Sequence, residues 1–380
     1  MQKKYKISIL GGYGLRNFGD DALMYILHKV MSSKYKKNNL SYICTPEKYL
    51  QNIIDSTDII DISSYNNLQT DILIYGGGTQ FYSFKAKRNL IYRIFINLKN
   101  PIVFIKKIKK KFFKRNSKKS INMIKTSALG IGVGPFLPQA DKNVELNTKQ
   151  LFLKMGFVGV RDSYSFNKCN KWGLNNVKQY ADLCYLMNDE FIFDSKKSST
   201  EVKKIGIVVR DWNHTKEGAA YYEQIIPLME KLRQNEYKVN ILLFSQKRDI
   251  YWLKKLKGIE SVIIWDPDKD TIKKFLKILD SFDLFITARY HGAVFSTLLG
   301  KPFISIGVEQ KLDMVSDLYQ NGSKKWNYPF QINECLSYVN DIDKNYIIMK
   351  ENIISNTKIQ TKLAQTMIKD FINYLDEGKM

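Results

Sequence analysis

The sequence predicts an α/β protein built from two domains, and three observations support this prediction. The chain has 380 residues, which exceeds the size at which a single hydrophobic core stops growing. Short apolar runs of strand length alternate with helical stretches, which is the pattern of βαβ units around a mostly parallel sheet. This alternation lapses once, in the polar stretch MNDEFIFDSKKSSTEVK at 187–203, which we interpret as a linker.

The first series of elements predicts a Rossmann-like domain over residues 1–186. The stretch YKISIL reads as a buried strand that runs into a glycine-rich turn, and NFGDDALMYILHKVMSS reads as the following helix. Further predicted strands are LSYICT, DILIYGGG, TSALGIGVG, GFVGVRD and VKQYAD, and SYSFNKCNKW is a predicted helix.

The second series predicts another Rossmann-like domain over 204–341, followed by a helical segment at 342–380. Its predicted strands are KKIGIVVRDW, YKVNILLFS, ESVIIWD, SFDLFITARYHG and GKPFISIGV, with helical stretches such as YYEQIIPLMEKLRQN and DKDTIKKFLKILDS between them. Ligands of such sheets bind beyond the carboxyl ends of the strands and at domain interfaces. We therefore expect a site in a central cleft that the two domains face.

Composition and charge bound the classes of partner. An apolar fraction of 44% with 13% aromatic residues excludes disorder across most of the chain. Sixty Lys and Arg against 37 Asp and Glu give a net charge of +23, which fits nucleic acid, anionic membranes or small anionic substrates. A Lys-, Asn- and Ile-rich composition from an AT-rich genome accounts for the same excess equally well.

Cysteine usage predicts a reducing compartment and no metal site. The four cysteines are Cys44, Cys169, Cys184 and Cys335. They lie far apart without a CxxC pair or a cluster with histidine, which argues against a zinc site and a disulfide framework. The first apolar run is shorter than that of a signal peptide, and no run reaches the length of a membrane span. We expect a cytoplasmic protein.

One segment, 84–120, breaks the pattern. It is rich in Lys and Arg, contains no Asp or Glu, and interleaves its cations with Phe, Ile and Tyr. A basic amphipathic segment of this kind suits an anionic membrane surface, and we predict peripheral docking on the inner face of the membrane. An ordinary solvated insertion is the alternative. Nucleic acid is not an expected partner, because no recognised binding motif is present.

Glycine-rich strand ends mark loops that approach a ligand. In GGYGLRNFGDDA at 11–22, Asn17 and Asp20 lie where a helix begins, and free N–H groups there favour anions. The spacing is neither GxGxxG nor Walker A, so it does not indicate NAD or ATP, and Asp20 could equally serve as a helix N-cap. Gly77 and Gly78 end another strand, where close approach of a ligand or a facing backbone explains the glycines.

Arginines at three predicted strand ends indicate an anionic substrate. Arg161, Arg210 and Arg289 each follow an apolar run, and arginine binds carboxylate and phosphate with two parallel hydrogen bonds. Each could instead form a structural ion pair with a nearby acid. His291 lies between Arg289 and Lys311 in sequence and is a candidate general acid/base. Flanking positive charge favours its neutral ring, and a bound dianion favours the imidazolium.

Taken together, these motifs resemble the polysaccharide pyruvyl transferase family. The resemblance rests on GGYGLRNFGDDA, DILIYGGG, GIGVGP, VRDSYS, YADLCYL, GIVVRDW and ARYHGAVFSTLLGKPFISIGVEQK, which occur in the family's order over about residues 5–320. Asp21 replaces the usual Glu, Leu183 replaces a common Pro, and segment 84–120 looks peculiar to this chain.

The resemblance implies a GT-B-like enzyme that transfers a pyruvyl group from phosphoenolpyruvate to a sugar of a surface polysaccharide, or of its lipid-linked precursor, as a cyclic ketal. It implies an acceptor side in the first domain and a donor side in the second, with no cofactor besides phosphoenolpyruvate. The implied catalytic residues are His291, Arg289 and Lys311. The implied donor-binding residues are Arg161, Arg210, Arg289, Lys311 and Gly292, and the implied acceptor or cleft-lining residues are Asn17, Asp20, Gly77, Gly78 and Asp182.

Two other interpretations stay open at the level of sequence. A GT-B glycosyltransferase would hold the diphosphate of a nucleotide sugar with the same cations, and Glu309 could bind its ribose. A non-catalytic scaffold with a decayed site is the second, and the joint presence of Arg161, Arg289, His291 and Lys311 argues against it.

Overall fold

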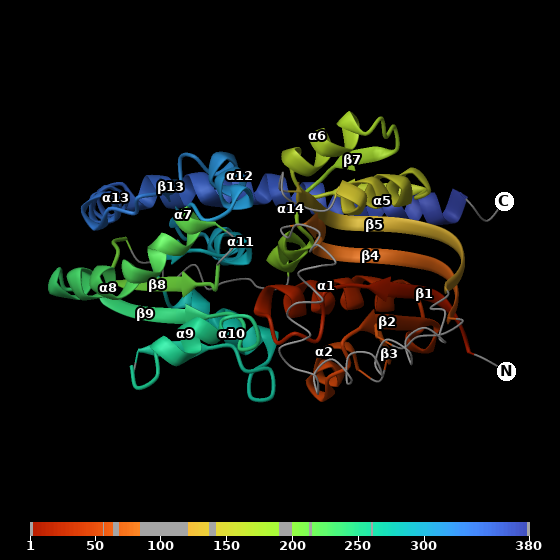
Figure 1. The fold of residues 1–380 in the computed structure, drawn as a ribbon, viewed down its shortest axis with the longest axis horizontal. Helices are drawn as coiled ribbons and strands as arrows, with labels where there is room; N and C mark the ends of the chain where they lie inside the picture. The colour runs from red at the N-terminus through yellow and green to blue at the C-terminus, as the bar shows by residue number, and fades with distance from the viewer. Residues whose placement is uncertain are drawn as a thin grey trace, which may run out of the picture.

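The computed structural model describes residues 3–55, 57–63, 68–83, 121–136, 142–189, 200–212, 215–259 and 261–377. These form two α/β halves, each built around a parallel sheet (Figure 1), as the sequence predicts. The basic segment 84–120 lies outside the described residues, so its docking to a membrane stays a prediction. Residues 190–199 of the expected linker also lie outside them.

The first half contains a seven-stranded sheet with the order β3-β2-β1-β4-β5-β6-β7. Its strands are β1 (Lys4–Leu10), β2 (Leu40–Cys44), β3 (Asp58–Asp61), β4 (Leu68–Ser83), β5 (Ile121–Phe136), β6 (Phe157–Val160) and β7 (Val177–Gln179). Its helices are α1 (Phe18–Lys34), α2 (Gln51–Ile54), α5 (Lys142–Leu153) and α6 (Ser163–Lys171), with 3-10 turns η1 (Lys37–Asn39), η2 (Lys48–Leu50) and η3 (Leu183–Asp189). All five residues of β2 and the residues Ile7–Ile9 of β1 are buried, which explains the mainly apolar sequences LSYIC and ISIL.

The second half contains a six-stranded sheet with the order β10-β9-β8-β11-β12-β13. Its strands are β8 (Lys204–Val209), β9 (Lys238–Leu243), β10 (Val262–Ile264), β11 (Leu284–Thr287), β12 (Phe303–Ile306) and β13 (Ser323–Trp326). Its helical elements are α7 (Lys216–Ala219), η5 (Ala220–Glu223), α8 (Ile225–Gln234), α9 (Ile250–Lys255), α10 (Ile272–Asp280), α11 (Tyr290–Leu298), α12 (Gln310–Leu318) and α13 (Ile332–Lys344). The polar sequence SKKW of β13 gave no strand signal, because this strand lies at the edge of the sheet.

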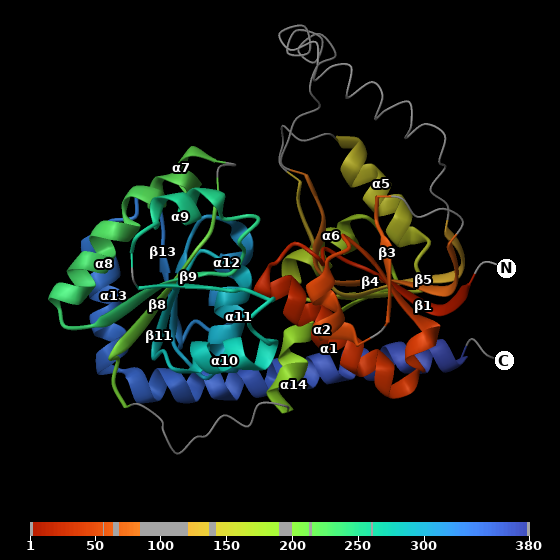
Figure 2. The same cartoon turned by 90° about the horizontal axis from the view of Figure 1, so that it is seen from below.

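The last helix, α14 (Tyr346–Glu377), returns the chain from the second half to the first (Figure 2). It contacts α11 of the second half and η3, β5 and β6 of the first. The expected helical segment at 342–380 contains α14, and α13 precedes it almost entirely within the part of the chain expected to form the second domain. None of the described helices, the 32-residue α14 included, combines the length and apolarity needed to cross a membrane.

The first turn of α1 joins the two halves through an aromatic cluster. The ring of Phe18 is fully buried and packs against Phe244, Trp265, Phe275 and Phe295 of the second half, with ring centroids 4.6–5.3 Å apart. Buried aromatic pairs of this geometry add stabilisation beyond the area that they bury.

Polar contacts fix the same joint. Asn17 forms an isolated antiparallel bridge with Ser245, and the backbone N–H of Phe18 donates to the carbonyl of Phe244 at 2.8 Å. Trp265 donates its indole N–H to the buried carboxyl group of Asp21 at 2.9 Å, and burial raises the pKa of Asp21 to about 7. The start of α1 is thereby held against the second half by both packing and hydrogen bonds.

Replacing Phe18 tests the importance of this joint for stability. We expect Phe18→Ala to lower the free energy of unfolding by about 3–5 kcal/mol, because it empties a closely packed aromatic site. Phe18→Leu retains much of the side-chain volume, so we expect it to lower the free energy of unfolding clearly less. Denaturant unfolding followed by tryptophan fluorescence measures both, and equal losses for the two variants would contradict this assignment.

Candidate active site

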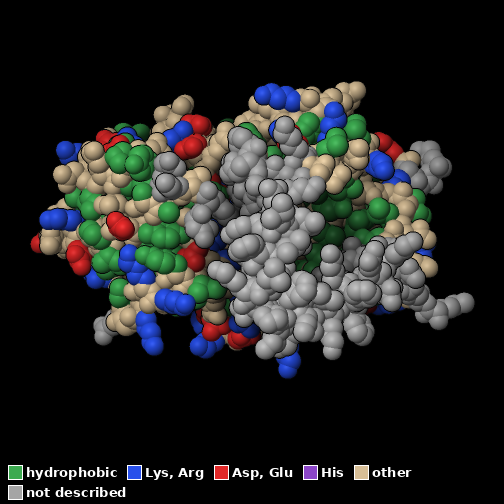
Figure 3. All heavy atoms as spheres, in the orientation of Figure 1, with side chains coloured by type: hydrophobic (Ala, Val, Ile, Leu, Met, Phe, Trp, Pro, Cys, Tyr) green, Lys and Arg blue, Asp and Glu red, His purple; other side chains and the backbone are tan. Residues whose placement is uncertain are grey.

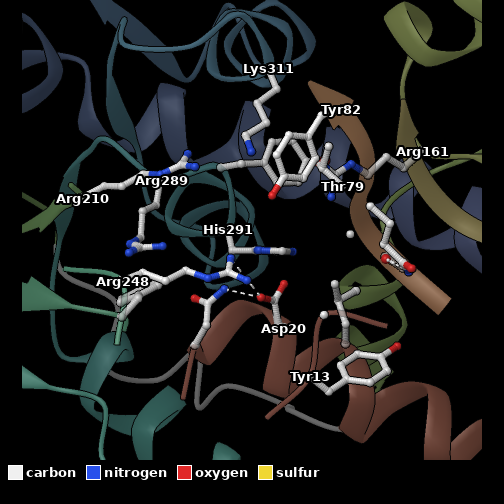
Figure 4. Close-up of a pocket in the computed structure, with 18 of the residues that line it drawn as sticks. Tyr13, Asp20, Thr79, Tyr82, Arg161, Arg210, Arg248, Arg289, His291 and Lys311 are labelled. Carbon is white, nitrogen blue, oxygen red and sulfur yellow. Dashed lines mark hydrogen bonds and ion pairs between the residues drawn. The ribbon is translucent and has the colours of Figure 1, made fainter. Parts of the chain in front are cut away.

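A pocket of about 660 Å³ lies between the two halves, where the carboxyl ends of both sets of strands converge (Figure 4). The structure brings most of the residues singled out by sequence into its lining. Those residues are Asn17, Asp20, Gly77, Gly78, Arg161, Arg210, Arg289, His291 and Lys311. The pocket lies at the interface between the domains, where the sequence led us to expect a site.

His291 is the second residue of α11 and faces the first half. Its Nε2 lies 3.7 Å from Oδ2 of Asp182, which is an ion-pair distance but too long for a hydrogen bond. This buried nitrogen has no hydrogen-bond partner among the described residues. From the sequence we expected only cations beside His291. The carboxylate of Asp182, a suitable partner for a protonated imidazole, was not expected there.

Arg161 follows β6, and the side chains that accept its hydrogen bonds lie in the first half, whereas Tyr290, which its guanidinium contacts, belongs to the second. Its Nη1 donates to Asp182 at 3.0 Å, its Nη2 donates to Oγ1 of Thr79 at 2.8 Å, and its guanidinium lies 4.0 Å from the ring centroid of Tyr290. Burial opposes the charge on Asp182, but His291 and Arg161 outweigh it and hold the pKa of that carboxyl well below its usual range. Arg161 thus anchors Asp182 beneath His291.

Asp182 itself is not among the residues that line the pocket. Its side chain is 0% exposed and lies behind His291 and Arg161. The sequence implied a cleft-lining role for Asp182, and the structure shows a supporting position instead.

Arg210 and Lys311 share one carboxylate. Arg210 follows β8, and its Nη1 contacts Oε1 of Glu309, while Nζ of Lys311 lies 3.1 Å from the same oxygen. Burial would raise the pKa of Glu309, but the two cations lower it below its ordinary value. Burial lowers the pKa of Lys311 to about 8, against the opposing effect of Glu309. Two cations on a single carboxylate leave a net positive charge at this wall of the pocket.

Arg289 caps the N-terminus of α11 and is held by a buried acid. Its Nη2 contacts both carboxylate oxygens of Asp249, and its Nε donates to the carbonyl of Val209 at 3.2 Å. Asp249 also accepts hydrogen bonds from the backbone N–H groups of Asp211 and Ser245. The predicted cation is therefore present, with its charge balanced inside the second half.

The glycines have different roles. Gly77 and Gly78 line the pocket with φ of +67° and +73°, a conformation that favours glycine. Gly292, implied as a donor-binding residue, does not line the pocket. A Cβ on Gly292 would lie 2.2 Å from Oγ1 of Thr287, so helix packing explains this glycine.

The N-cap of α1 is Asn17 rather than Asp20. Nδ2 of Asn17 donates to Oδ2 of Asp20 at 2.6 Å, and Asp20 lies in the first helical turn and faces the pocket. The alternative interpretation of Asp20 as the helix N-cap is therefore wrong.

Sequence reasoning missed Arg248, which also lines the pocket. Its Nη1 lies 3.4 Å from Oδ2 of Asp20, and its side chain is 45% exposed. The stretch SQKRD follows the apolar run ILLF, which begins in β9, so the strand-end rule that selected Arg210 would have selected Arg248 as well.

One cluster has the composition of a metal site. Ligand atoms of Asp182, Cys184 and His291 lie within 4.8 Å of one another, although the sequence showed no Cys/His cluster. Arg161 already supplies positive charge to Asp182, and burial raises the pKa of the Cys184 thiol well above its ordinary range. A protonated thiol binds a metal ion poorly, and the nearby guanidinium of Arg161 repels one. The absence of a metal stays a prediction.

A protein-family model described as polysaccharide pyruvyl transferase matches residues 17–310 of this chain. The matched region runs from the N-cap of α1 to the start of α12 and includes every strand except β1 and β13. Of the cations that line the pocket, it includes all except Lys311. A search of curated proteins finds no match.

Solved structures share the two-domain arrangement. UDP-GlcNAc 2-epimerase from Neisseria meningitidis has a TM-score of 0.60 at 10% identity and covers 97% of this chain and 100% of that chain. A putative UDP-N-acetylglucosamine 2-epimerase from Listeria monocytogenes has a TM-score of 0.55 at 10% identity, with coverage of 99% and 98%. Such likenesses show the fold, which is of the GT-B type, and not the activity.

The contact between Gly19 and His291 provides a test of the site geometry. A Cβ on Gly19 would lie 2.2 Å from Nδ1 of His291, so we expect Gly19→Ala to lower the free energy of unfolding by about 1–3 kcal/mol through overpacking. Gly12→Ala is the matched control, because the nearest atom to its Cβ would be 3.8 Å away. Thermal unfolding of both variants is the measurement. Gly19→Ala as stable as Gly12→Ala would contradict the placement of His291.

Proposed function

Because the chain belongs to the polysaccharide pyruvyl transferase family, we propose that it transfers a pyruvyl group from phosphoenolpyruvate to two hydroxyls of a polysaccharide sugar, forming a cyclic ketal. The observation that carries this proposal is the position of His291 between a buried carboxylate, Asp182, and a wall with net positive charge, Arg210 and Lys311.

The second half suits the donor. Phosphoenolpyruvate carries a phosphate and a carboxylate, and Arg210 and Lys311 provide two cations against the single charge of Glu309. The helices α11 and α12 both begin at this wall, with His291 and Lys311 as their second residues. Helix N-termini direct unpaired backbone N–H groups and positive dipole ends toward an anion.

His291 is the proposed acid. With its positive charge balanced by Asp182 behind it, the imidazolium of His291 delivers a proton to C3 of the enol, and a sugar hydroxyl attacks C2. Phosphate then leaves, and the second hydroxyl attacks C2 to close the ketal. Overall, the two sugar hydroxyls lose two protons. One returns to His291, which gave a proton to C3, and the other leaves with phosphate as hydrogen phosphate. Cations held in place before reaction stabilise the charge that develops on the departing phosphate.

The alternative donor is a nucleotide sugar, which a GT-B fold also accommodates. Glu309 was the residue proposed to bind its ribose. That carboxylate is 3% exposed, pairs with Arg210 and Lys311, and does not line the pocket. This pairing removes the one ribose ligand that the sequence suggested for a nucleotide sugar.

The family implies a polysaccharide acceptor, and the first half is its proposed side. Tyr82, Gln80 and Asp20 line that wall of the pocket and offer hydroxyl, amide and carboxylate groups for a sugar. On the described part of the face in Figure 3, Lys and Arg side chains are dispersed over both halves. Attachment to a membrane that carries the acceptor remains a proposal for segment 84–120.

Donor identity is tested by calorimetric titration with phosphoenolpyruvate beside UDP- and GDP-sugars. We expect phosphoenolpyruvate to bind and Lys311→Met to weaken it about tenfold or more, because a charge-assisted contact is removed. Lys269→Met, an 80% exposed site away from the pocket, is the control. Binding of a nucleotide sugar in place of phosphoenolpyruvate would contradict the donor assignment.

The pKa of Lys311 predicts a pH dependence of donor binding. With a pKa of about 8, Lys311 is charged below this pH and neutral above it, so donor affinity should fall about tenfold between pH 7 and pH 9. Lys311→Arg should keep its affinity over this range, because arginine remains protonated. An unchanged profile in Lys311→Arg would assign the titration to another group.

A further inference from the structure

Arg248 differs from the other cations of the pocket in how it is paired. Arg161, Arg210, Arg289 and Lys311 have side chains that are 2–23% exposed, and each pairs with a carboxylate of its own half. Arg248 is 45% exposed, and its ion pair crosses from the second half to Asp20 of the first at 3.4 Å. Among the described residues, no other carboxylate pairs with it.

The partner of Arg248 lies beside the proposed acid. Asp20 follows Gly19, which contacts the ring of His291, and its carboxylate faces the pocket between Gly12 and Gly78. In Figure 4, Arg248 extends from the second half toward Asp20, close to His291. Nδ2 of Asn17 holds Oδ2 of Asp20 at 2.6 Å, so the carboxylate keeps its position whether or not Arg248 contacts it.

The guanidinium of Arg248 suits a phosphate, whereas the carboxylate of Asp20 suits a sugar hydroxyl. An exposed pair at this distance contributes little stability, whereas a guanidinium and a phosphate form short, paired hydrogen bonds. A phosphate in the pocket would therefore compete successfully for Arg248. The carboxylate left behind accepts hydrogen bonds only, which suits a sugar hydroxyl.

We propose that Arg248 is a donor-binding residue that Asp20 holds aside before the donor binds. The donor phosphate draws Arg248 away from Asp20, and the freed carboxylate then receives an acceptor hydroxyl. Donor binding thereby precedes acceptor binding. The identity of the donor in this scheme rests on the proposed function, whereas competition between Asp20 and an anion for Arg248 does not.

A double-mutant cycle tests this competition. Phosphoenolpyruvate and, separately, inorganic phosphate are titrated calorimetrically into the full-length protein and its Asp20→Asn, Arg248→Ala and doubly substituted variants. Asp20→Asn releases Arg248, so we expect it to tighten anion binding about two- to fivefold, the range expected for an exposed ion pair. Arg248→Ala should weaken binding about tenfold or more, with partial recovery in Arg248→Lys. The double variant should match Arg248→Ala.

Lys247 and Glu47 provide the matched control. Lys247 directly precedes Arg248 in the chain, and its ion pair with Glu47 also joins the second half to the first. Neither residue lines the pocket. Lys247→Ala and Glu47→Gln should leave anion affinity unchanged. Weaker or unchanged binding in Asp20→Asn, or tightening by Asp20→Asn that persists without Arg248, would overturn the proposal. The expected pattern with inorganic phosphate, combined with no binding of phosphoenolpyruvate, would support the competition and reject the donor.

Discussion

The joint at the start of α1 is the constraint on which the site depends. Phe18 inserts into an aromatic cluster of the second half, while Asn17 and Asp21 add backbone and side-chain hydrogen bonds beside it. This contact brings the first turn of α1 against the first turn of α11, so that Gly19 packs on His291. A glycine is required there because any side chain would displace the ring. The position of His291 in the second half therefore depends on its packing against α1 of the first half.

Charge balance is the second organising feature. Asp182, Asp249 and Glu309 are all buried acids, and each holds one or two pocket cations in place. Removing one partner of such a pair destabilises the folded protein, because a buried charge is left uncompensated. The carboxylates thus fix the cations in advance and limit the net positive charge to the wall formed by Arg210 and Lys311, with Arg248 as a more exposed addition. A pocket organised in this way attracts an anion and orders it at one wall.

Much of the fold could be predicted from the sequence, because buried parallel strands produce apolar runs such as those of β6, β8 and β11. The ends of these runs located Arg161, Arg210 and Arg289 in one cleft. The partners of these arginines could not be predicted, since Asp249 and Glu309 lie 40 and 99 residues from the arginines that they hold. Gly292 shows the opposite error, where a motif glycine was given a ligand role although helix packing against Thr287 requires it.

The most direct test of the central claim is a crystal structure of the protein with phosphoenolpyruvate bound. The account predicts the phosphate in contact with Lys311 and Arg210, the methylene carbon facing the imidazole ring of His291, and Arg248 turned from Asp20 toward the donor. A donor bound outside this pocket, or bound with its methylene carbon directed away from His291, would contradict it.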